Sequence, residues 1–477
     1  MLKIIEIPYR DPLEVCALWA DDPYIGFLDS AATGDPRAHY SYLGIDPFQI
    51  VDVTGGITRI DGVPVDGDPF WVLASLLERY RISEEAPVPF IGGAMGFLGY
   101  ELGRYLERLP QRHPIAADRP EMAMGLYDLV IAFDTVLRKA WVLSSGWPEH
   151  EPAARRARAE QRARACIARL DQAQPGLAPP KQAAATWRSD LSPAAYREKI
   201  GQILEHIRAG DIFQANFTMR FEARRPPGPS RFDFYRDLRS RNPGPFAAYL
   251  GCGPALTLAS ASPERFLSLD RDGRIEARPI KGTRPRGTTA EEDADLCRAL
   301  SESAKDRAEN LMITDLIRND LGRVAETGSV SVPTLCDIER FANVHHMVSV
   351  VKARLRQGLG PIDLLRAAFP GGSVTGAPKI RAMEIIDALE VSARGPYCGA
   401  IAWIGFDGAM DSSIVIRTLA ITETMIVAQA GGGIVADSDP EAEYWELVLK
   451  ALPLLQVLGG AWWEGRQGDV VAERRAP

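Results

Sequence analysis

A helix-favouring run that ends in a proline-rich segment divides this chain and constrains its fold more than any other feature. Residues 153–170 carry six arginines among alanines, with no glycine or proline to interrupt a helix. The segment that follows cannot continue the helix, because it contains Pro175, Gly176, Pro179 and Pro180. We therefore expect three regions, at residues 1–150, 151–188 and 189–462.

The sequence patterns differ on the two sides of this division. Before it, short apolar runs alternate with turn signals, as in residues 90–100 and 126–134, which is typical of strands with glycine-rich connections. After it, Ser192 and Pro193 form a helix-start signal, with proline at the first helical position. Apolar residues then recur with helical spacing, at Ile200, Ile203, Leu204 and Ile207.

Composition excludes several classes of protein. The 477 residues are 46% hydrophobic and 25% charged, as in an ordinary soluble protein. A formal charge of -8 does not favour a nucleic-acid partner, and we interpret the arginine-rich helix as a solvated surface. With no signal peptide and no membrane-spanning run, we expect a cytoplasmic protein without a membrane partner. Six widely spaced cysteines are expected to be buried and reduced: Cys16, Cys166, Cys252, Cys297, Cys336 and Cys398.

Two segments each place a pair of carboxylates three residues apart. The pairs are Asp306 with Glu309, and Glu443 with Glu446. A helix-start signal precedes the second pair, at Ser438, Asp439 and Pro440. On a helix this spacing puts both acids on one face, which Lys450 also shares in the second segment. Acids from two helices can converge on magnesium, which takes oxygen ligands and bridges carboxylates to an anionic substrate. Taken alone, however, either pair is better explained as a solvated helix face.

Three glycine-rich segments follow the linker, at residues 279–283, 369–379 and 430–435. Glycine allows a backbone to approach a ligand closely, although a single run of this kind is usually a tight turn. The second segment is not a nucleotide-binding loop, because Ala377 and Pro378 follow Gly376 where that motif requires lysine and serine or threonine. The joint occurrence of these segments with the acid pairs indicates a common site.

In their order along the chain, these segments resemble the chorismate-binding enzymes. That family includes the component I proteins of anthranilate synthase and aminodeoxychorismate synthase, and the isochorismate and salicylate synthases. The matching segments span nearly the whole chain: residues 210–216, 262–266, 279–283, 309–320, 346–349, 369–379 and 417–419, and the closing glycines with Glu443, Glu446 and Lys450.

The resemblance implies an α/β (α+β) fold in which two antiparallel sheets pack as a large sandwich with helices outside. Both halves of the chain would contribute to this sandwich. Residues 1–150 would form the anthranilate synthase component I-like N-terminal region, and 189–462 the chorismate-binding catalytic region. The charged helix and proline-rich linker at 151–188 would connect them.

The resemblance also implies how chorismate, a dianion, is held. A magnesium ion near Glu309 and Glu446, with Asp306 and Glu443 in its surroundings, would hold the ring carboxylate. The side chains of Arg417 and Tyr397 would bind the enolpyruvyl carboxylate. Backbone amides of Gly431, Gly432 and Gly433 would complete this clamp. Arginine suits this role because its planar fork matches a carboxylate.

Further site residues follow from the same resemblance. Glu264 would be the general acid that protonates the departing 4-hydroxyl group, and His346 would lie near the ring carboxylate, with His345 as a structural neighbour. A core histidine remains the alternative for His346. The other positions assigned to substrate binding are Gln214, Asn216, Thr283 and Lys450.

Lys281 is the residue that distinguishes between members of the family. Members that add water carry a lysine base where this chain has Gln214, so ammonia is the expected nucleophile. Anthranilate synthases typically have alanine in the Pro-Ile-x-Gly-Thr motif, whereas aminodeoxychorismate synthases resemble this chain in having lysine, and Asn216 is a second, weaker match to them. Lys281 would attack ring carbon C2 and later be displaced by ammonia at C4; a purely electrostatic contact is the alternative.

The expected product is therefore 4-amino-4-deoxychorismate, a precursor for 4-aminobenzoate and folate. Anthranilate synthase component I is the alternative function, and a non-catalytic nucleic-acid-binding protein that uses the arginine-rich helix is a more distant one. Ammonia would come from a separate glutamine amidotransferase subunit, because Gly251-Cys252-Gly253 lacks a glutaminase motif. The family also binds tryptophan in its N-terminal half. Because Phe27-Leu28-Asp29-Ser30 only approximates the regulatory signature, inhibition by tryptophan is not expected.

Overall fold

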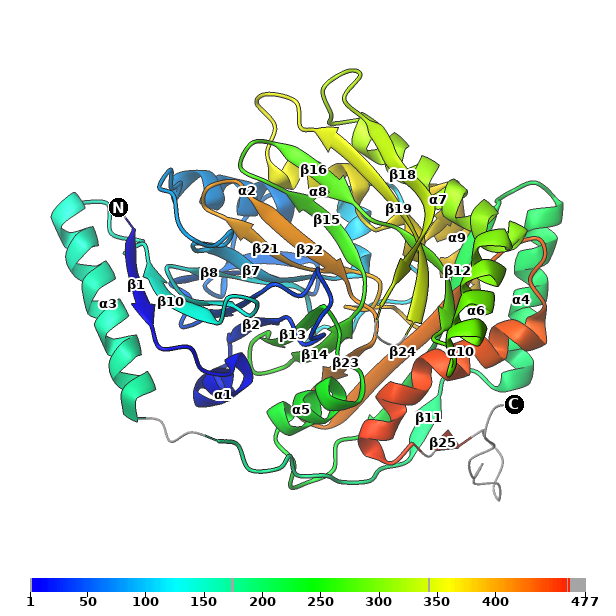
Figure 1. Ribbon diagram of the computed structural model, residues 1–477, viewed down its shortest axis with the longest axis horizontal. Helices are drawn as coiled ribbons and strands as arrows, with labels where there is room; N and C mark the ends of the chain where they lie inside the picture. The colour runs from blue at the N-terminus through cyan, green and yellow to red at the C-terminus, as the bar shows by residue number, and fades with distance from the viewer. Residues whose placement is uncertain (1, 173–175, 342–343, 461, 464–477) are drawn as a thin grey trace.

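A computed structural model describes residues 2–172, 176–341, 344–460 and 462–463. Pro175 of the linker lies outside the described residues. Among those described, the strands form two sheets of 13 and 12 strands, which run antiparallel except where β11 pairs with β25. Helices cover the outer faces of the sheets (Figure 1). The predicted two-sheet sandwich with surrounding helices is confirmed.

The first sheet runs in the order β1-β10-β9-β3-β2-β13-β14-β23-β24-β12-β11-β25, with the short strand β20 paired to β12. Its strands are β1 (Lys3–Ile7), β2 (Gly26–Asp29), β3 (Tyr40–Gly44), β9 (Leu129–Asp134), β10 (Lys139–Ser144), β11 (Trp187–Ser189), β12 (Gln214–Arg224), β13 (Phe246–Gly251), β14 (Thr257–Ser262), β20 (Gly376–Ala377), β23 (Thr418–Ile421), β24 (Met425–Ile434) and β25 (Trp462–Trp463).

The second sheet runs in the order β17-β19-β16-β15-β22-β21-β7-β8-β4-β5-β6, with β18 also paired to β19. Its strands are β4 (Gln49–Thr54), β5 (Ile57–Ile60), β6 (Val63–Pro64), β7 (Gly93–Leu98), β8 (Pro120–Tyr127), β15 (Arg265–Leu269), β16 (Arg274–Ala277), β17 (Ile280–Pro285), β18 (Ser331–Arg340), β19 (Val344–Arg354), β21 (Ala400–Gly405) and β22 (Met410–Ile414).

Each sheet contains strands from both sides of the linker. In the first sheet β2 pairs with β13, and in the second β7 pairs with β21. Between the sheets, Phe97 and Ile401 of the second pack in one buried cluster with Leu250 and Leu258 of the first. Both halves of the chain therefore build one sandwich, as the resemblance implied.

The helices connect and cover the strands. The α-helices are α1 (Pro12–Cys16), α2 (Pro69–Arg79), α3 (Pro152–Gln172), α4 (Pro193–Arg208), α5 (Arg231–Arg241), α6 (Ala290–Glu302), α7 (Ala304–Gly322), α8 (Pro361–Ala368), α9 (Lys379–Leu389) and α10 (Pro440–Leu455). Short 3₁₀ helices lie at η1 (Ala17–Trp19), η2 (Tyr100–Tyr105), η3 (Gly372–Val374) and η4 (Gln456–Leu458).

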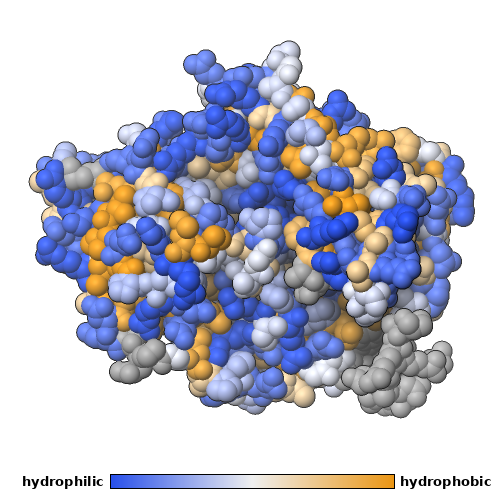
Figure 2. Space-filling view, viewed as in Figure 1, coloured by the Kyte–Doolittle hydropathy of each residue, from blue (hydrophilic) through white to orange (hydrophobic). Residues whose placement is uncertain are grey.

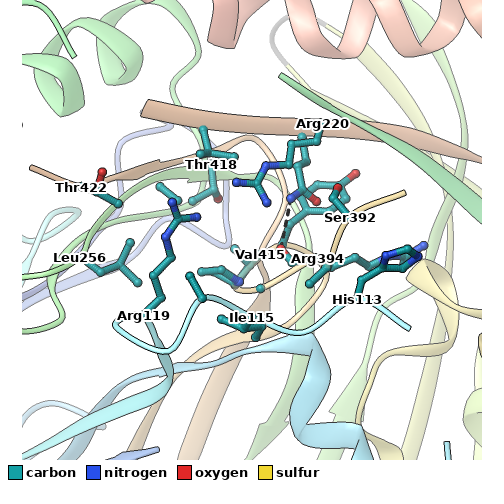
Figure 3. Close-up of a pocket in the computed structure, with 18 of the residues that line it drawn as sticks. His113, Ile115, Arg119, Arg220, Leu256, Ser392, Arg394, Val415, Thr418 and Thr422 are labelled. Atoms are coloured by element: carbon teal, nitrogen blue, oxygen red, sulfur yellow. Dashed lines mark hydrogen bonds between the residues drawn. The ribbon is translucent and has the colours of Figure 1, made fainter. Parts of the chain in front are cut away.

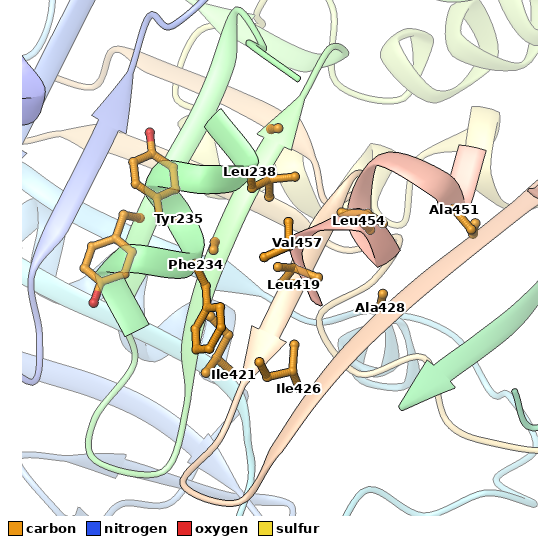
Figure 4. Packing of buried hydrophobic residues seen from close by; sticks show 14 of the residues in the cluster. Phe234, Tyr235, Leu238, Leu419, Ile421, Ile426, Ala428, Ala451, Leu454 and Val457 are labelled. Carbon is orange, nitrogen blue, oxygen red and sulfur yellow. The ribbon is translucent and has the colours of Figure 1, made fainter. Parts of the chain in front are cut away.

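Apolar side chains of α5 and α10 pack on the first sheet. Figure 4 shows Phe234 and Leu238 of α5 near Leu419 of β23. It also shows Leu454 of α10 near Ala428 of β24. All belong to one buried cluster. Burial of apolar area contributes roughly 25 cal/mol per Å² and fixes α10 against β24. The acids Glu443 and Glu446 of α10 therefore lie beside this strand.

The helices begin where the sequence predicted. In α4, Pro193 is the first residue, and the side chain of Ser192 accepts a hydrogen bond from the amide of Ala195. In α10, Asp439 caps the helix and Pro440 opens it. Both capping side chains satisfy amides that have no partner within the helix.

The arginine-rich helix α3 is bound to the protein through part of its positive charge. Its small and apolar residues, from Ala159 to Leu170, face the core. Arg162 pairs with Asp128 at 3.1 Å and with Asp46 at 2.7 Å, and Arg155 donates a hydrogen bond to the carbonyl oxygen of Ser145. This helix is therefore attached to the sandwich through several of its arginines.

All six cysteines are free thiols, as expected. Five are buried, but Cys297 is only half-buried, so the expectation of burial is wrong at this position. It lies on α6, where a side chain of Arg340 approaches its sulfur at 3.9 Å. Among the described residues, no helix is both long enough and apolar enough to cross a membrane. The cytoplasmic location stays a prediction.

A buried ion pair at the end of α9 bonds to two other segments, the strand β12 and the short helix η3. Arg394 and Glu390 are 3% and 7% exposed, and their closest nitrogen and oxygen are 2.7 Å apart. Arg394 also donates to the carbonyl oxygens of Val374 and Asn216, at 2.8 and 2.6 Å. Glu390 accepts a hydrogen bond from the Thr218 hydroxyl at 2.8 Å. The pair therefore fixes β12 and η3 relative to α9.

Substitution of Glu390 tests this role. We expect Glu390→Gln to lower the free energy of unfolding by about 3–5 kcal/mol, because the guanidinium of Arg394 stays buried without a counter-charge. The matched control is Glu384→Gln on the same helix, where the ion pair to Arg381 is exposed and the expected loss is below about 0.5 kcal/mol. Urea denaturation of both variants measures the difference, and equal losses would contradict the assignment.

Candidate active site

A cavity of about 1050 Å³ lies where β17 and β19 of the second sheet approach β24 of the first. Residues of α7 and α10 also line it, together with the loop at residues 31–37. Hydrophilic residues gather around the hollow near the middle of the face shown in Figure 2. The cavity therefore draws its lining from both halves of the chain.

Most of the residues predicted from the sequence line this one cavity: Asn216, Glu264, Lys281, Thr283, Asp306, Glu309, His346, Tyr397, Arg417, Gly431, Gly433, Glu443, Glu446 and Lys450. Gln214 and Gly432 do not line it. Gln214 is completely buried against Gly433, and Gly432 faces the acids of α10. The structure thus brings the predicted set together, while the role of each residue stays a prediction.

Lys281 lies on β17 and is surrounded by groups from other elements. Its Nζ is 3.4 Å from the carbonyl oxygen of Ser373 in the second glycine-rich segment. Its positive charge acts to lower the pKa of Glu264 and Glu309. A Cβ atom on Gly433 would lie 3.6 Å from the same Nζ, so bare backbone of β24 lies next to the amine. Lys281 is therefore a cation shared by acids from different elements.

Glu264 lies in the turn between β14 and β15. Burial raises the pKa of its carboxyl group, although the positive charge of Lys281 and a hydrogen bond with Ser373 oppose this shift. A raised pKa leaves more of the carboxyl group protonated near neutral pH. This environment suits a general acid.

The two acids of α7 have different surroundings. Asp306 accepts a hydrogen bond from Arg284 at 2.9 Å. Among the described residues, the side chain of Glu309 makes neither a hydrogen bond nor an ion pair. Burial raises the pKa of Glu309, and the nearby charges of Asp306 and Glu443 add to this effect, whereas Lys281 opposes it. Of the two acids of α7, Glu309 is therefore the one that a bound cation would stabilise more.

The two acids of α10 already contact cations. Glu443 is 5% exposed, accepts a hydrogen bond from Ser438 at 2.6 Å and lies 3.5 Å from Nζ of Lys305. Glu446 pairs with Nζ of Lys450 at 2.6 Å. Burial alone would raise the pKa of Glu446, but the charge and hydrogen bond of Lys450 outweigh it and lower the pKa.

These acids suit a magnesium ion without forming a complete metal site by themselves. Within the described parts of the chain, no three histidine, cysteine, aspartate or glutamate side chains are arranged to hold a metal. Magnesium commonly takes one or two protein carboxylates and completes its shell with water and substrate oxygens. The donors are all carboxylates, and Glu309 lacks a protein partner, so the residues fit such an ion.

Gly431, Gly432 and Gly433 lie inside β24 rather than in a turn. A Cβ atom on Gly431 would lie 2.2 Å from the carbonyl oxygen of Phe217 on β12, which leaves no room for a side chain. A Cβ atom on Gly432 would lie 3.3 Å from an oxygen of Glu443. These glycines therefore allow close packing on one side and leave space beside the acids on the other.

Arg417 immediately precedes β23 with a φ of 53°, a left-handed conformation that is uncommon for arginine. It donates a hydrogen bond to the carbonyl oxygen of Lys450 at 3.0 Å. Burial lowers the pKa of Arg417, although Tyr397 and Glu446 oppose this effect. No ion pair involves its guanidinium within the described residues, so it retains donors for a ligand carboxylate.

His346 on β19 lies 2.8 Å from the hydroxyl of Thr283 on the neighbouring strand β17. Burial lowers the pKa of His346 to about 4, and the charge of Arg37 contributes. The imidazole is therefore neutral near neutral pH and can donate or accept a hydrogen bond. His345 is fully buried and lies 2.8 Å from Asp293, outside the cavity lining.

Two amide side chains lie at the start of β12. Gln214 is fully buried, and neither polar atom of its amide has a hydrogen-bond partner among the described residues. The side-chain nitrogen of Asn216 is likewise unpaired, while its backbone amide donates to Thr375 at 2.7 Å. Buried polar atoms without partners are commonly satisfied by water or a ligand. Asn216 lines the cavity and can serve a ligand directly.

The sequence contains no local signal for the contribution of the loop at residues 31–37. Arg37 donates to the carbonyl oxygen of Pro263 at 3.3 Å, across 226 positions of sequence, and pairs with Asp35 at 2.7 Å. Its guanidinium also lies 4.5 Å from the ring centre of Phe341. This N-terminal loop therefore lies against the residues next to Glu264 and His346.

The family model for chorismate binding enzymes matches residues 32–456. The chain belongs to the chorismate binding enzyme family. Aminodeoxychorismate synthase component 1 of Klebsiella aerogenes is 45% identical over 371 residues, 78% of this chain and 78% of that protein. Anthranilate synthase component 1 of Thermus thermophilus is 38% identical over 92% of this chain and 93% of that protein.

A solved member of the chorismate binding enzymes has the same fold. The crystal structure of anthranilate synthase component I from Streptococcus pneumoniae matches with a TM-score of 0.78 and 33% identity, over 87% of this chain and 92% of that one. Because the match covers 87% of this chain, the sandwich that positions the cavity is shared with this relative.

Alanine substitutions in β24 test the two environments of its glycines. We expect Gly431→Ala to lower the free energy of unfolding by about 1–3 kcal/mol or more, because its methyl group would meet the backbone of Phe217. Gly432→Ala is the matched control, since its methyl group would meet only the flexible ends of Glu443, Glu446 and Lys450. Urea denaturation distinguishes them, and a Gly431→Ala variant as stable as the native protein would refute the packing argument.

Proposed function

We propose that this chain is aminodeoxychorismate synthase component I, which converts chorismate and ammonia to 4-amino-4-deoxychorismate. The observation that supports this most is the position of Lys281 beside Glu264 in the cavity that also contains Arg417 and the acids of α7 and α10. An amine that would act as the nucleophile and a carboxyl group that would act as the proton donor therefore line the same cavity as the groups that would fix the substrate.

Binding would fix the two carboxylates of chorismate at separate places. Arg417 and Tyr397, with backbone amides of residues 431–433, would receive the enolpyruvyl carboxylate. Glu309 and Glu446 would hold a magnesium ion, with Asp306 and Glu443 nearby, and the bound ion would neutralise the ring carboxylate and polarise the ring. His346, neutral at the reaction pH, would donate a hydrogen bond to the same end of the substrate.

The reaction would then proceed in two displacements. The nitrogen of Lys281 forms a bond to ring carbon C2, both ring double bonds shift, and the C4–oxygen bond breaks as Glu264 protonates the departing hydroxyl group to give water. Ammonia next forms a bond to C4, both double bonds shift back, and the bond between C2 and Lys281 breaks. The electron pair of that bond returns to the lysine nitrogen, and no net oxidation or reduction occurs.

Both groups need the correct protonation state before the first displacement. Lys281 must be a neutral amine to attack, and Glu264 must carry a proton to give. Transfer of one proton from the Lys281 ammonium group to the Glu264 carboxylate supplies both states at once. The burial that raises the pKa of Glu264 favours this transfer.

Two ligands complete the proposal. Ammonia would come from a separate glutamine amidotransferase subunit, in keeping with the name component 1 of the Klebsiella aerogenes relative. Tryptophan would occupy a different cavity, of about 480 Å³, beside Leu28, Asp29 and Ser30. The Asp29 carboxylate there already accepts a hydrogen bond from the Tyr235 hydroxyl at 2.7 Å. Tryptophan would therefore be held by other groups of that cavity.

Product analysis tests the function. With chorismate, ammonium and magnesium, we expect the purified chain to form aminodeoxychorismate, which a lyase then converts to 4-aminobenzoate. Removal of magnesium with EDTA should abolish turnover, and adding excess magnesium should restore it. Anthranilate synthase component 1 is the competing function, because relatives of that name also match most of the chain. Fluorescent anthranilate and free pyruvate as products would refute our proposal.

Covalent capture tests the role of Lys281. Without ammonia, we expect intact-protein mass spectrometry to show an added mass of chorismate less one water. Lys281→Ala should lose this adduct and more than about 10³-fold in kcat, because a covalent nucleophile is removed. Lys305→Ala is the control, since this lysine also lines the cavity but pairs with Glu443. An adduct that persists in Lys281→Ala would exclude the nucleophilic role and leave the product assay unaffected.

A further inference from the structure

A second cavity, of about 400 Å³, lies directly behind the active site. Its walls come from residues 113–120 before and at the start of β8, from residues 391–397 after α9, and from β12, β23 and β24. Tyr397 and Gln429 line both this cavity and the active site. The two spaces are therefore separated in part by these side chains.

The lining of this second cavity is strongly cationic. Figure 3 shows the guanidinium groups of Arg119 and Arg220 extending into the same space from opposite walls. His113 and Arg394 also belong to the lining, which contains no aspartate or glutamate among its described residues. Arg394 is neutralised by its pair with Glu390. The charge of Arg119 and the unpaired Nε of Arg220 are therefore the donors that remain for an anion in this space.

Neither of these arginines is fully satisfied by the protein. Arg220 pairs with Glu222 at 2.5 Å, yet its Nε is buried and has no hydrogen-bond partner among the described residues. For the guanidinium of Arg119, the described part of the chain provides neither a hydrogen bond nor an ion pair. Like charges that converge repel one another, and a bound anion removes the repulsion while supplying the missing acceptors.

The rest of the lining is apolar. Hydrophobic side chains surround the space next to the arginines: Ile115, Leu256, Val391, Val415, Ala420 and Val427. The volume falls within the range of roughly 300–1,000 Å³ that is usual for small-molecule sites. An inorganic anion would leave most of these apolar surfaces uncovered. A ligand with one charged end and an apolar body would use both parts.

We propose that this cavity binds a small organic monocarboxylate with an apolar body, whose carboxylate lies between Arg119 and Arg220. Its apolar body packs against the wall that contains Val415 and Tyr397. Because Tyr397 also lines the active site, an occupant contacts the active site from behind. The inference rests on the second cavity alone and does not depend on the reaction proposed above.

Benzoate is a suitable probe, and the active site must first be prevented from binding it. We would measure benzoate binding by isothermal titration calorimetry to the full chain in an Arg417→Gln background, which removes the carboxylate clamp of the active site. Saturable binding of one benzoate per chain is expected. Benzamide, which has the same shape without the charge, and inorganic phosphate, which has charge without the apolar body, should each bind at least about tenfold more weakly.

Substitution of Arg119 then locates the site. Arg119→Gln in the same background should weaken benzoate binding at least about tenfold, because a charge-assisted hydrogen bond is lost. The matched control is Arg108→Gln, an exposed arginine outside the lining, which should bind benzoate like its parent. If Arg119→Gln does not fold, as judged by thermal melting, Arg119→Lys serves, with an intermediate loss expected.

Several results would overturn the proposal. These are the absence of saturable benzoate binding, equal binding of benzamide or phosphate, and benzoate binding that Arg119→Gln leaves unchanged. Binding that is present in the native chain but lost in Arg417→Gln would assign benzoate to the active site and would equally refute a second carboxylate site.

Discussion

The ion pair of Arg394 with Glu390 is the interaction on which the site depends. These two side chains bond directly to β12 and to the segment that contains Ser373, and Glu390 immediately follows α9. Gln429 of β24 also donates to the carbonyl oxygen of Arg394, at 3.2 Å. One buried charge pair thus sets the relative positions of the strands and the loop that place Asn216 and the partner of Lys281. Arg394 also lines the second cavity.

The active site concentrates charge of both signs before any ligand arrives. Lys281 influences acids from the turn after β14 and from α7, whereas Lys450 neutralises Glu446 on its own helix. Glu309 and Arg417 make no ion pair with another described residue, although charged groups lie near both. A dianion together with a divalent cation is complementary to this arrangement, because each unpaired group then gains a counter-charge. The charged groups of the active site are thus already in place before a ligand binds.

Much of this arrangement was predictable because its signals are local. The helix starts at Pro193 and Pro440 follow from capping residues, and the acid pairs follow from helical spacing. Arg394 was not predictable in this way, because it is four residues from Glu390 and such a pair usually lies on a surface. The loop at residues 31–37 was also missed, since only the completed sandwich brings it to Pro263. Contacts of long sequence separation leave no periodic pattern.

The joining of both halves in each sheet has a consequence for synthesis of the protein. β2 lies between β3 and β13, and β7 lies between β8 and β21, so each has one neighbour from before the linker and one from after it. The ribosome delivers the first half with these two strand edges unpaired and apolar, and such edges attract other chains. The nascent protein must be kept from aggregating until β13 and β21 emerge, so its yield in the cell depends on translation and chaperones as well as on final stability.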